Sequence, residues 1–205
     1  MVVKNIIKDI FPSMWPMILF VTVVYITLRC FYLFKGSKSI VLHKEILMLI
    51  FVVYVLCLYY ILTYQDVGYG GINFVPFKEM FRYSFGSYKF IKNIIGNILL
   101  FIPFGFFVSY YLNNKKTLVA LLSAFIVSGC AESLQYYIGR VFDIDDIILN
   151  VFGAFLGYLL FVCLSAIKGR LPKFMRTDAF INFLVIVIII VIILFSLKIN
   201  IFNYL

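Results

Sequence analysis

Charged residues are scarce in this chain: they make up 13% of its 205 residues, whereas 64% of the residues are hydrophobic. A soluble globular domain carries roughly 25% charged residues, because polar surface has to cover its core. Several apolar runs also reach the roughly 20 residues that cross a hydrocarbon core about 30 Å thick. The composition therefore excludes a soluble domain and predicts an all-α integral membrane protein.

Metal ligands and nucleophile pairs are equally scarce. His43 is the only histidine, and the four cysteines lie within or at the ends of apolar runs without forming a CxxC pair. A Cys/His zinc site is excluded on this spacing, and so are the Ser/His and Cys/His arrangements of common hydrolases. No cofactor is evident, although a divalent cation bound through carboxylate oxygens stays open.

The net charge of +9 is not gathered on one face, as nucleic-acid binding would require. Short basic clusters instead separate the apolar runs, where they set membrane orientation and face anionic lipid. We therefore expect membrane lipids as partners and no nucleic acid. The clusters comprise Lys35, Lys38, Lys44, Lys115, Lys116, Lys168, Arg170, Lys173 and Arg176.

The apolar runs predict a polytopic bundle of about six transmembrane helices in a single membrane domain, residues 1–205. The first run is too long for the core of a signal peptide and lacks a cleavage site, so we expect it to stay as a helix. Between spans two and three, residues 78–90 form either an interfacial segment or an ordinary loop with aromatic residues. The expected spans are 14–34, 46–64, 93–112, 118–138, 147–167 and 180–197.

The basic clusters follow spans one, three and five, which predicts those connections to be cytoplasmic and both termini to be outside. The opposite face carries nearly as many basic residues but also most of the acids. A labelling map that placed Lys115 outside would contradict this orientation. The expected location is thus a multi-pass protein of a bacterial cell membrane, with the connections after spans two and four on the extracytoplasmic side.

Acidic residues crowd into one short stretch: of nine Asp and Glu residues, four lie between Glu132 and Asp146. Glu132 and Gln135 are three residues apart and share a helical face. A carboxylate in a membrane helix is costly unless it is paired or hydrated. We expect Arg140 and the amide of Gln135 to be the partners of Glu132.

A stripe of polar and small residues follows the fourth span. Asp143 is placed to cap the next helix, and Asp146 falls in its first turn, where the helix dipole favours negative charge. Asn150, Gly153 and Gly157 continue the stripe, and the two glycines predict a close approach by another helix.

The third span brings a second set of polar groups to the same membrane face. Asn93 and Asn97 lie one turn apart, and Pro103 frees a carbonyl near Leu99 that a neighbour has to satisfy. Two crossings separate the connections after spans two and four, so both connections lie on one side of the membrane. We therefore expect the aspartates of residues 143–146, Asn97 and the segment 73–77 to lie at the same depth in the membrane.

These residues resemble the VanZ-like family over residues 73–161. The first matching pattern is Asn97 followed by Phe101, Pro103 and Gly105; the second comprises Glu132, Gln135, Arg140, Asp143, Asp146, Asn150, Gly153 and Gly157; and Asn73 to Phe77 resembles the Asn-x-x-Pro-Phe segment before them. The resemblance implies a small polytopic bacterial membrane protein. It also implies a role in reducing susceptibility to teicoplanin. The resemblance assigns no catalytic residue to this chain.

Three hypotheses follow. The first is a non-catalytic envelope protein that acts at the outer leaflet on the access of a lipid or a lipidated glycopeptide antibiotic. The second is an intramembrane enzyme for a lipid or lipid-linked precursor, with Glu132, Asp143 and Asp146 as candidate catalytic residues. In the third, the cluster only locks two helices together. The predicted ligand-binding residues are Asn97, Glu132, Gln135, Arg140, Asp143, Asp146 and Asn150.

Overall fold

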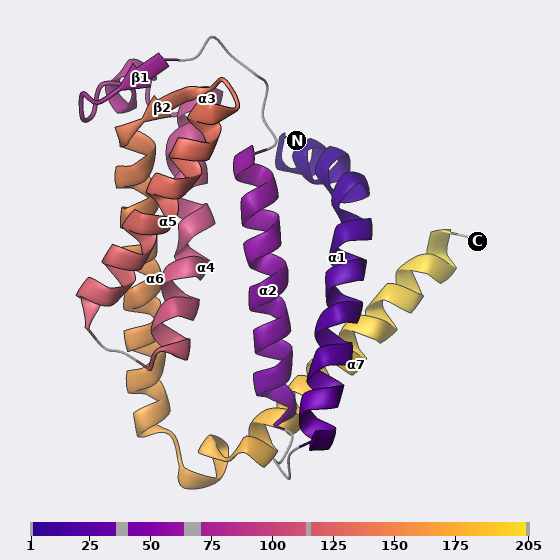
Figure 1. Cartoon of the computed structure of the whole chain (residues 1–205). Coiled ribbons are helices and arrows are strands. Elements are labelled where there is room, and N and C mark those ends of the chain that lie inside the picture. The colour runs from indigo at the N-terminus through magenta and orange to yellow at the C-terminus, as the bar shows by residue number, and fades with distance from the viewer. Residues whose placement is uncertain (1, 36–40, 64–70, 114–115, 204–205) are drawn as a thin grey trace. The chain divides into compact units, whose positions relative to one another are not determined.

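The computed structural model describes the backbone of residues 2–35, 41–63, 71–113 and 116–203, and the side chains of residues 14–32, 41–62, 71–113 and 116–190 (Figure 1). Lys38 and Lys115, two members of the predicted basic clusters, lie outside the described residues. The chain divides into two compact units, one of residues 54–166 and one of residues 1–53 with 167–205.

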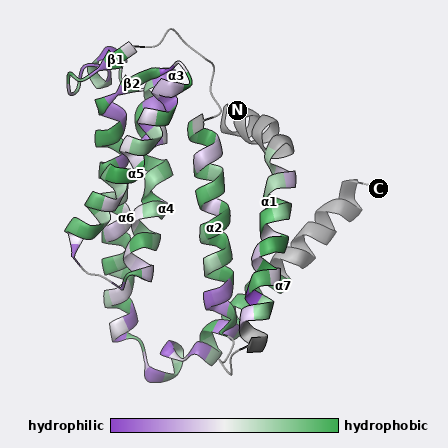
Figure 2. Cartoon of the chain, in the orientation of Figure 1, coloured by the Kyte–Doolittle hydropathy of each residue, from purple (hydrophilic) through white to green (hydrophobic). Residues whose placement is uncertain are grey.

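Among the described residues, five helical segments are long and apolar enough to cross a membrane, and a sixth apolar helix follows them (Figure 2). The sixth is α7 (Asp178–Asn203), whose side chains are described as far as Ile190. The predicted all-α membrane bundle is confirmed, although the ends of the predicted spans 14–34, 46–64 and 180–197 extend past the described side chains. The five segments are Met14–Tyr32 of α1 (Val2–Lys35), Leu42–Leu62 of α2 (Leu42–Thr63), Tyr88–Tyr111, α5 (Thr117–Tyr137) and α6 (Ile144–Arg170).

The third span begins five residues before its predicted start at residue 93, because Ser87 caps it. The Ser87 Oγ accepts a hydrogen bond from the backbone N–H of Phe90 at 3.2 Å, which satisfies a free donor of the first turn. The span then runs through α3 (Tyr88–Phe90), a π-helical turn η2 (Ile91–Ile95) and α4 (Gly96–Tyr111). Such π turns are frequent beside functional sites, and this one ends just before Asn97.

Glycines let α4 and α6 approach each other closely. A Cβ atom at Gly153 would meet the backbone of Ile98, and one at Gly157 would meet the backbone of Ile102 and Phe106. In return, a Cβ at Gly105 of α4 would meet the backbone of Ala154. The predicted small-residue face of α6 is therefore confirmed, and its partner is α4.

A single core holds the unit of residues 54–166 together. Its buried members come from the end of α2 and from α4, α5 and α6: Leu58, Leu62, Phe101, Phe104, Ala124 and Ala154. Tyr54 donates its hydroxyl proton to the carbonyl oxygen of Leu100 at 2.6 Å. The acceptor lies in the helical turn before Pro103, next to Leu99, whose carbonyl loses its helical partner to the proline.

A two-stranded parallel sheet, which the sequence did not predict, joins the connection after span two to the connection after span four. Strand β1 (Gly71–Asn73) pairs with β2 (Val141–Asp143) so that Asn73 lies opposite Asp143. Three-residue strands are too short to show an alternating pattern, so the sequence carries no signal for them. The sheet confirms that the segments after spans two and four lie together.

Polar contacts link the helices of the other unit. Arg29 of α1 donates two hydrogen bonds of 2.6 Å to the Glu45 carboxylate of α2. Lys44 lies 3.2 Å from the carboxylate of Asp178 at the start of α7, which follows the 3-10 helix η3 (Lys173–Arg176). These contacts place the starts of α2 and α7 together at the end of α1.

Substituting Gly157 with alanine tests the close packing of α4 and α6. The added methyl group would displace the backbone of α4, and overpacking of this kind costs about 1–3 kcal/mol. We expect Gly157→Ala to melt earlier than the native protein in detergent, measured by size exclusion after heating.

Gly129→Ala on α5 is the matched control, because a Cβ there meets no atom within 4 Å. This substitution should leave the melting temperature unchanged or raise it, since alanine favours a helix over glycine by about 1 kcal/mol. Equal melting of the two variants would contradict the packing described.

Candidate functional site

The segment after β1 is fixed to the helices by the buried carboxylate of Asp145. Asp145, at the start of α6, is 1% exposed. Its two oxygens accept hydrogen bonds from the backbone N–H groups of Phe77 at 2.5 Å, Glu79 at 2.8 Å and Met80 at 3.2 Å. A carboxylate that accepts several backbone hydrogen bonds holds a chain segment firmly, because each charged bond is stronger than a neutral one.

Asp145 was not among the predicted site residues, although Asp143 and Asp146 were. Asp143 and Asp146 could be assigned by helix spacing, whereas Asp145 acts on a segment more than sixty residues earlier. The only sequence feature that pointed to Asp145 was the close spacing of three aspartates at the start of α6.

Asp143 connects the sheet to the start of α6. Its Oδ1 accepts hydrogen bonds of 3.0 Å from the Asn73 amide and from the backbone N–H of Asp145. The second bond confirms that Asp143 caps α6. Burial raises the pKa of the Asp143 carboxyl, while these two hydrogen bonds lower it. Asn73 in turn accepts from the N–H of Val75 at 3.3 Å, which begins the turn after β1.

Glu132 is also 1% exposed, but its partner differs from the one expected. Its Oε2 accepts a hydrogen bond from the backbone N–H of Asp143 at 3.1 Å. Arg140 and Gln135 instead donate to the carbonyl oxygen of Leu62, at 3.3 Å and 2.9 Å, and no ion pair joins Glu132 to Arg140 within the described residues. The reason is that α2 ends beside α5, and its last carbonyls need donors.

The remaining predicted residues form hydrogen bonds between α4, α5 and α6. Asn97 of α4 donates to the Asp146 carboxylate at 2.6 Å, and Asn150 of α6 donates to the Ser128 hydroxyl of α5 at 2.8 Å. All seven predicted ligand-binding residues therefore lie within the unit of residues 54–166. Their hydrogen bonds form four separate groups, together called the polar network: Glu132 with Asp143, Gln135 and Arg140 with the Leu62 carbonyl, Asn97 with Asp146, and Asn150 with Ser128.

The network contains more acceptors than donors. The side-chain oxygens of Gln135 and Asn150 are buried and have no hydrogen-bond partner among the residues whose side chains are described. Buried polar atoms are rarely left unpaired, so this interior suits an additional donor such as a carboxyl proton. The described part of the chain has no group of three or more His, Cys, Asp or Glu side chains that could hold a metal ion. The divalent cation stays a prediction.

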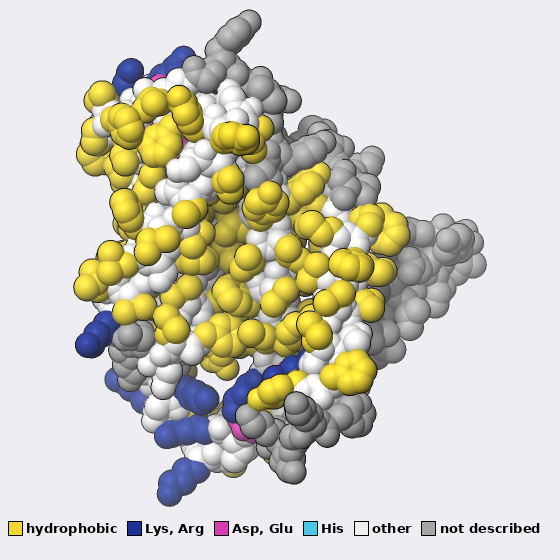
Figure 3. Space-filling view, viewed as in Figure 1, with side chains coloured by type: hydrophobic (Ala, Val, Ile, Leu, Met, Phe, Trp, Pro, Cys, Tyr) yellow, Lys and Arg dark blue, Asp and Glu magenta, His cyan; other side chains and the backbone are white. Residues whose placement is uncertain are grey.

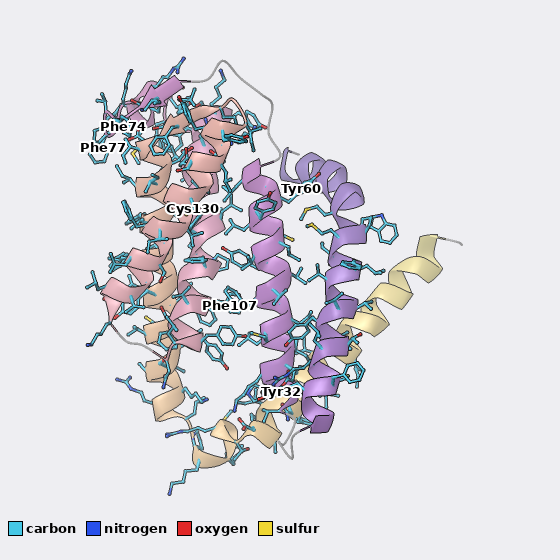
Figure 4. All side chains as sticks on the ribbon, in the orientation of Figure 1. Tyr32, Tyr60, Phe74, Phe77, Phe107 and Cys130 are labelled. Atoms are coloured by element: carbon cyan, nitrogen blue, oxygen red, sulfur yellow. The ribbon has the colours of Figure 1, made fainter. Side chains whose placement is uncertain are left out.

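Large aromatic side chains are exposed on the segment that Asp145 holds. Phe81, in the 3-10 helix η1 (Met80–Arg82), is 85% exposed, and Phe85 is 92% exposed. Figure 4 shows Phe74 and Phe77 at the same end of the unit, and Figure 3 shows Lys and Arg side chains beside hydrophobic ones there. Aromatic and basic residues together are typical of a membrane–water interface, which favours the interfacial alternative for residues 78–90.

Replacing Asp145 with asparagine tests its hold on this segment. The neutral amide offers one acceptor oxygen where the carboxylate offers two, and hydrogen bonds to a charged group contribute about 1.5–3 kcal/mol each. We therefore expect trypsin to cleave Asp145→Asn after Lys78 and Arg82 roughly tenfold faster or more than the native protein. Cleavage products would be followed by mass spectrometry.

Asp178→Asn is the matched control, because Asp178 also begins a helix but its side chain is half exposed. Its cleavage after Lys78 and Arg82 should equal that of the native protein. Unchanged cleavage in Asp145→Asn would show that the carboxylate does not hold the segment.

Comparison with known proteins supports the resemblance seen in the sequence. The model of a family described as VanZ/LLP1 matches residues 46–166, a range that contains the predicted core of residues 73–161. No curated protein matches the chain, and no solved structure matches it. Because the match covers more than half of the sequence and the whole polar network, the chain belongs to the VanZ/LLP1 family.

Proposed function

We propose that this membrane protein reduces susceptibility to teicoplanin and related lipoglycopeptides by acting at the outer leaflet on the access of the antibiotic or of lipid. In this proposal the end of the 54–166 unit that carries β1 faces the cell exterior. The protein performs no reaction there. It occupies or alters the membrane surface that a lipidated antibiotic uses.

The exposed aromatic segment held by Asp145 is the observation that supports this proposal. Phe81 directly follows the residues whose backbone N–H groups bind the buried Asp145 carboxylate, and the centroid of the Phe85 ring lies 5.0 Å from that of the Phe90 ring. The backbone that carries the exposed rings is therefore anchored before any ligand arrives. A preorganised aromatic surface loses little conformational entropy on binding an apolar chain. Teicoplanin carries an acyl chain and vancomycin does not, so such a surface would distinguish the two drugs.

Expression in a susceptible Gram-positive host tests the proposal. We expect the native protein to raise the inhibitory concentration of teicoplanin severalfold while that of vancomycin stays unchanged, because the acyl chain is the group engaged. Phe81→Ser with Phe85→Ser should abolish this effect at equal membrane abundance.

Phe174→Ser is the matched control, because Phe174 is also an exposed phenylalanine of a 3-10 helix but follows span five, on the expected cytoplasmic face. This variant should protect as well as the native protein. Equal protection against both drugs, or none from abundant native protein, would refute the proposal.

Glu132→Gln and Asp146→Asn separate function from structural locking. If the network serves a ligand, the variants should accumulate normally in the membrane and lose protection against teicoplanin. If the network only joins helices, membrane abundance and protection should fall together. Immunoblotting of membranes beside the inhibition assay distinguishes these outcomes.

The acceptor-rich interior supports a second candidate function, an intramembrane enzyme acting on a lipid or lipid-linked precursor. Here Glu132 and Asp146 would exchange a proton with the substrate, and the unpaired oxygens of Gln135 and Asn150 would accept from it. Turnover of labelled envelope lipids by the purified protein, lost in Glu132→Gln, would favour this candidate over the first.

A further inference from the structure

A cavity of about 450 Å³ lies beside the start of the third span. Its walls come from one short stretch of chain between η1 and α3, and none of the lining residues is acidic. The lining residues are Arg82, Tyr83, Ser84, Ser87, Tyr88 and Lys89. We propose that this cavity binds the phosphate group of an anionic lipid headgroup. The proposal deepens the proposed function and rests on it for placing this end at the membrane surface.

Two cations give the cavity its charge. Arg82 uses one guanidinium nitrogen, Nη1, to contact the Glu79 carboxylate at 3.1 Å and 3.3 Å. Its Nε and Nη2 have no hydrogen-bond acceptor among the described side chains and backbone carbonyls, so they are available to a ligand. Lys89, the other cation of the lining, has no ion-pair partner among the described side chains. A guanidinium fork beside an ammonium group suits a phosphate, whose oxygens accept several charged hydrogen bonds.

Hydroxyl groups complete a set of donors. The Tyr83 hydroxyl accepts a hydrogen bond from the Asn93 amide at 3.0 Å, which leaves its own proton to donate. The Ser87 hydroxyl likewise accepts from the N–H of Phe90 at 3.2 Å and keeps its proton. Ser84 adds a third hydroxyl. Cations and hydroxyl donors without a carboxylate in the lining favour an anion with several acceptor oxygens.

The turn between the serines shapes the cavity. The backbone N–H of Ser87 donates to the carbonyl oxygen of Ser84 at 3.0 Å, and Gly86 adopts a φ of 78°, a left-handed conformation that favours glycine. This turn places both serines beside the first residues of a helical segment that continues to Tyr111. The positive end of its dipole adds to the charge of the two cations.

Apolar surroundings favour a lipid over free phosphate as the source of the group. Phe81 and Phe85 border the lining residues in sequence, and Tyr88 of the lining is itself half exposed. The span from Tyr88 to Tyr111 is apolar enough to cross a membrane, and its residues from Ile98 to Val108 carry no charged side chain. A lipid whose phosphate enters the cavity would therefore find an apolar helix for its acyl chains.

Native mass spectrometry of the purified full chain in neutral detergent tests the proposal with three probes. These are phosphatidylglycerol, a diacylglycerol with the same acyl chains, and inorganic phosphate. We expect adducts with phosphatidylglycerol alone. Arg82→Gln with Lys89→Gln should weaken that binding by roughly tenfold or more, because charge-assisted hydrogen bonds are lost.

Lys78→Gln with Lys92→Gln is the matched control, since it removes the same charge from the same stretch outside the cavity lining. It should bind phosphatidylglycerol as the native protein does, and both double variants should match the native elution on size exclusion. Equal weakening in the two double variants would indicate general surface charge and overturn the proposal. Equal binding of diacylglycerol would overturn it too, because the phosphate would not be recognised.

Inorganic phosphate distinguishes the source of the group. If it binds as tightly as phosphatidylglycerol, a lipid source is refuted. The same variants in the teicoplanin assay keep the two proposals apart. Lipid binding without protection by the native protein would refute the proposed function while the phosphate site stood. Protection without lipid binding would refute the site alone.

Discussion

Inside a hydrocarbon layer no water is available to backbone or side-chain polar groups, so each must find a partner within the protein. The unit of residues 54–166 shows how strongly this constraint acts. The carbonyl oxygen of Leu62 at the end of α2 accepts hydrogen bonds from Gln135 and Arg140. The Leu100 carbonyl oxygen, in the turn before Pro103, accepts one from the Tyr54 hydroxyl. The buried carboxylates of Glu132 and Asp145 receive backbone N–H groups from connections outside the helices. The polar residues of the family pattern thus serve the fold and form the candidate site together.

Local patterns in the sequence were sufficient for the parts of the structure that depend on one helix. Apolar runs predicted the spans, the spacing of Gly153 and Gly157 predicted a close helix contact, and Asp143 was identified as a cap. Each of these follows from residues within a few turns of one another, where helix periodicity decides which side chains share a face.

The parts that could not be predicted depend on chain segments that are distant in sequence. The sheet pairs residues seventy positions apart, and Asp145 binds a turn at a similar separation. Glu132 was expected to pair with a charged side chain, but a backbone N–H of the neighbouring connection lies closer. Local spacing does not predict which backbone N–H group will bind a buried carboxylate, so only the folded structure shows it.

The parallel pairing of β1 with β2 has a consequence for how the chain enters the membrane. Two strands can pair only when they lie on the same side of the bilayer, and here α4 and α5 cross it between them. The pairing of the strands therefore requires an even number of membrane crossings between them. A chain in which one of these helices failed to insert would carry β1 and β2 on opposite sides, unable to meet. The sheet and the carboxylates beside it would then form only in correctly threaded molecules, which makes them a check on membrane topology.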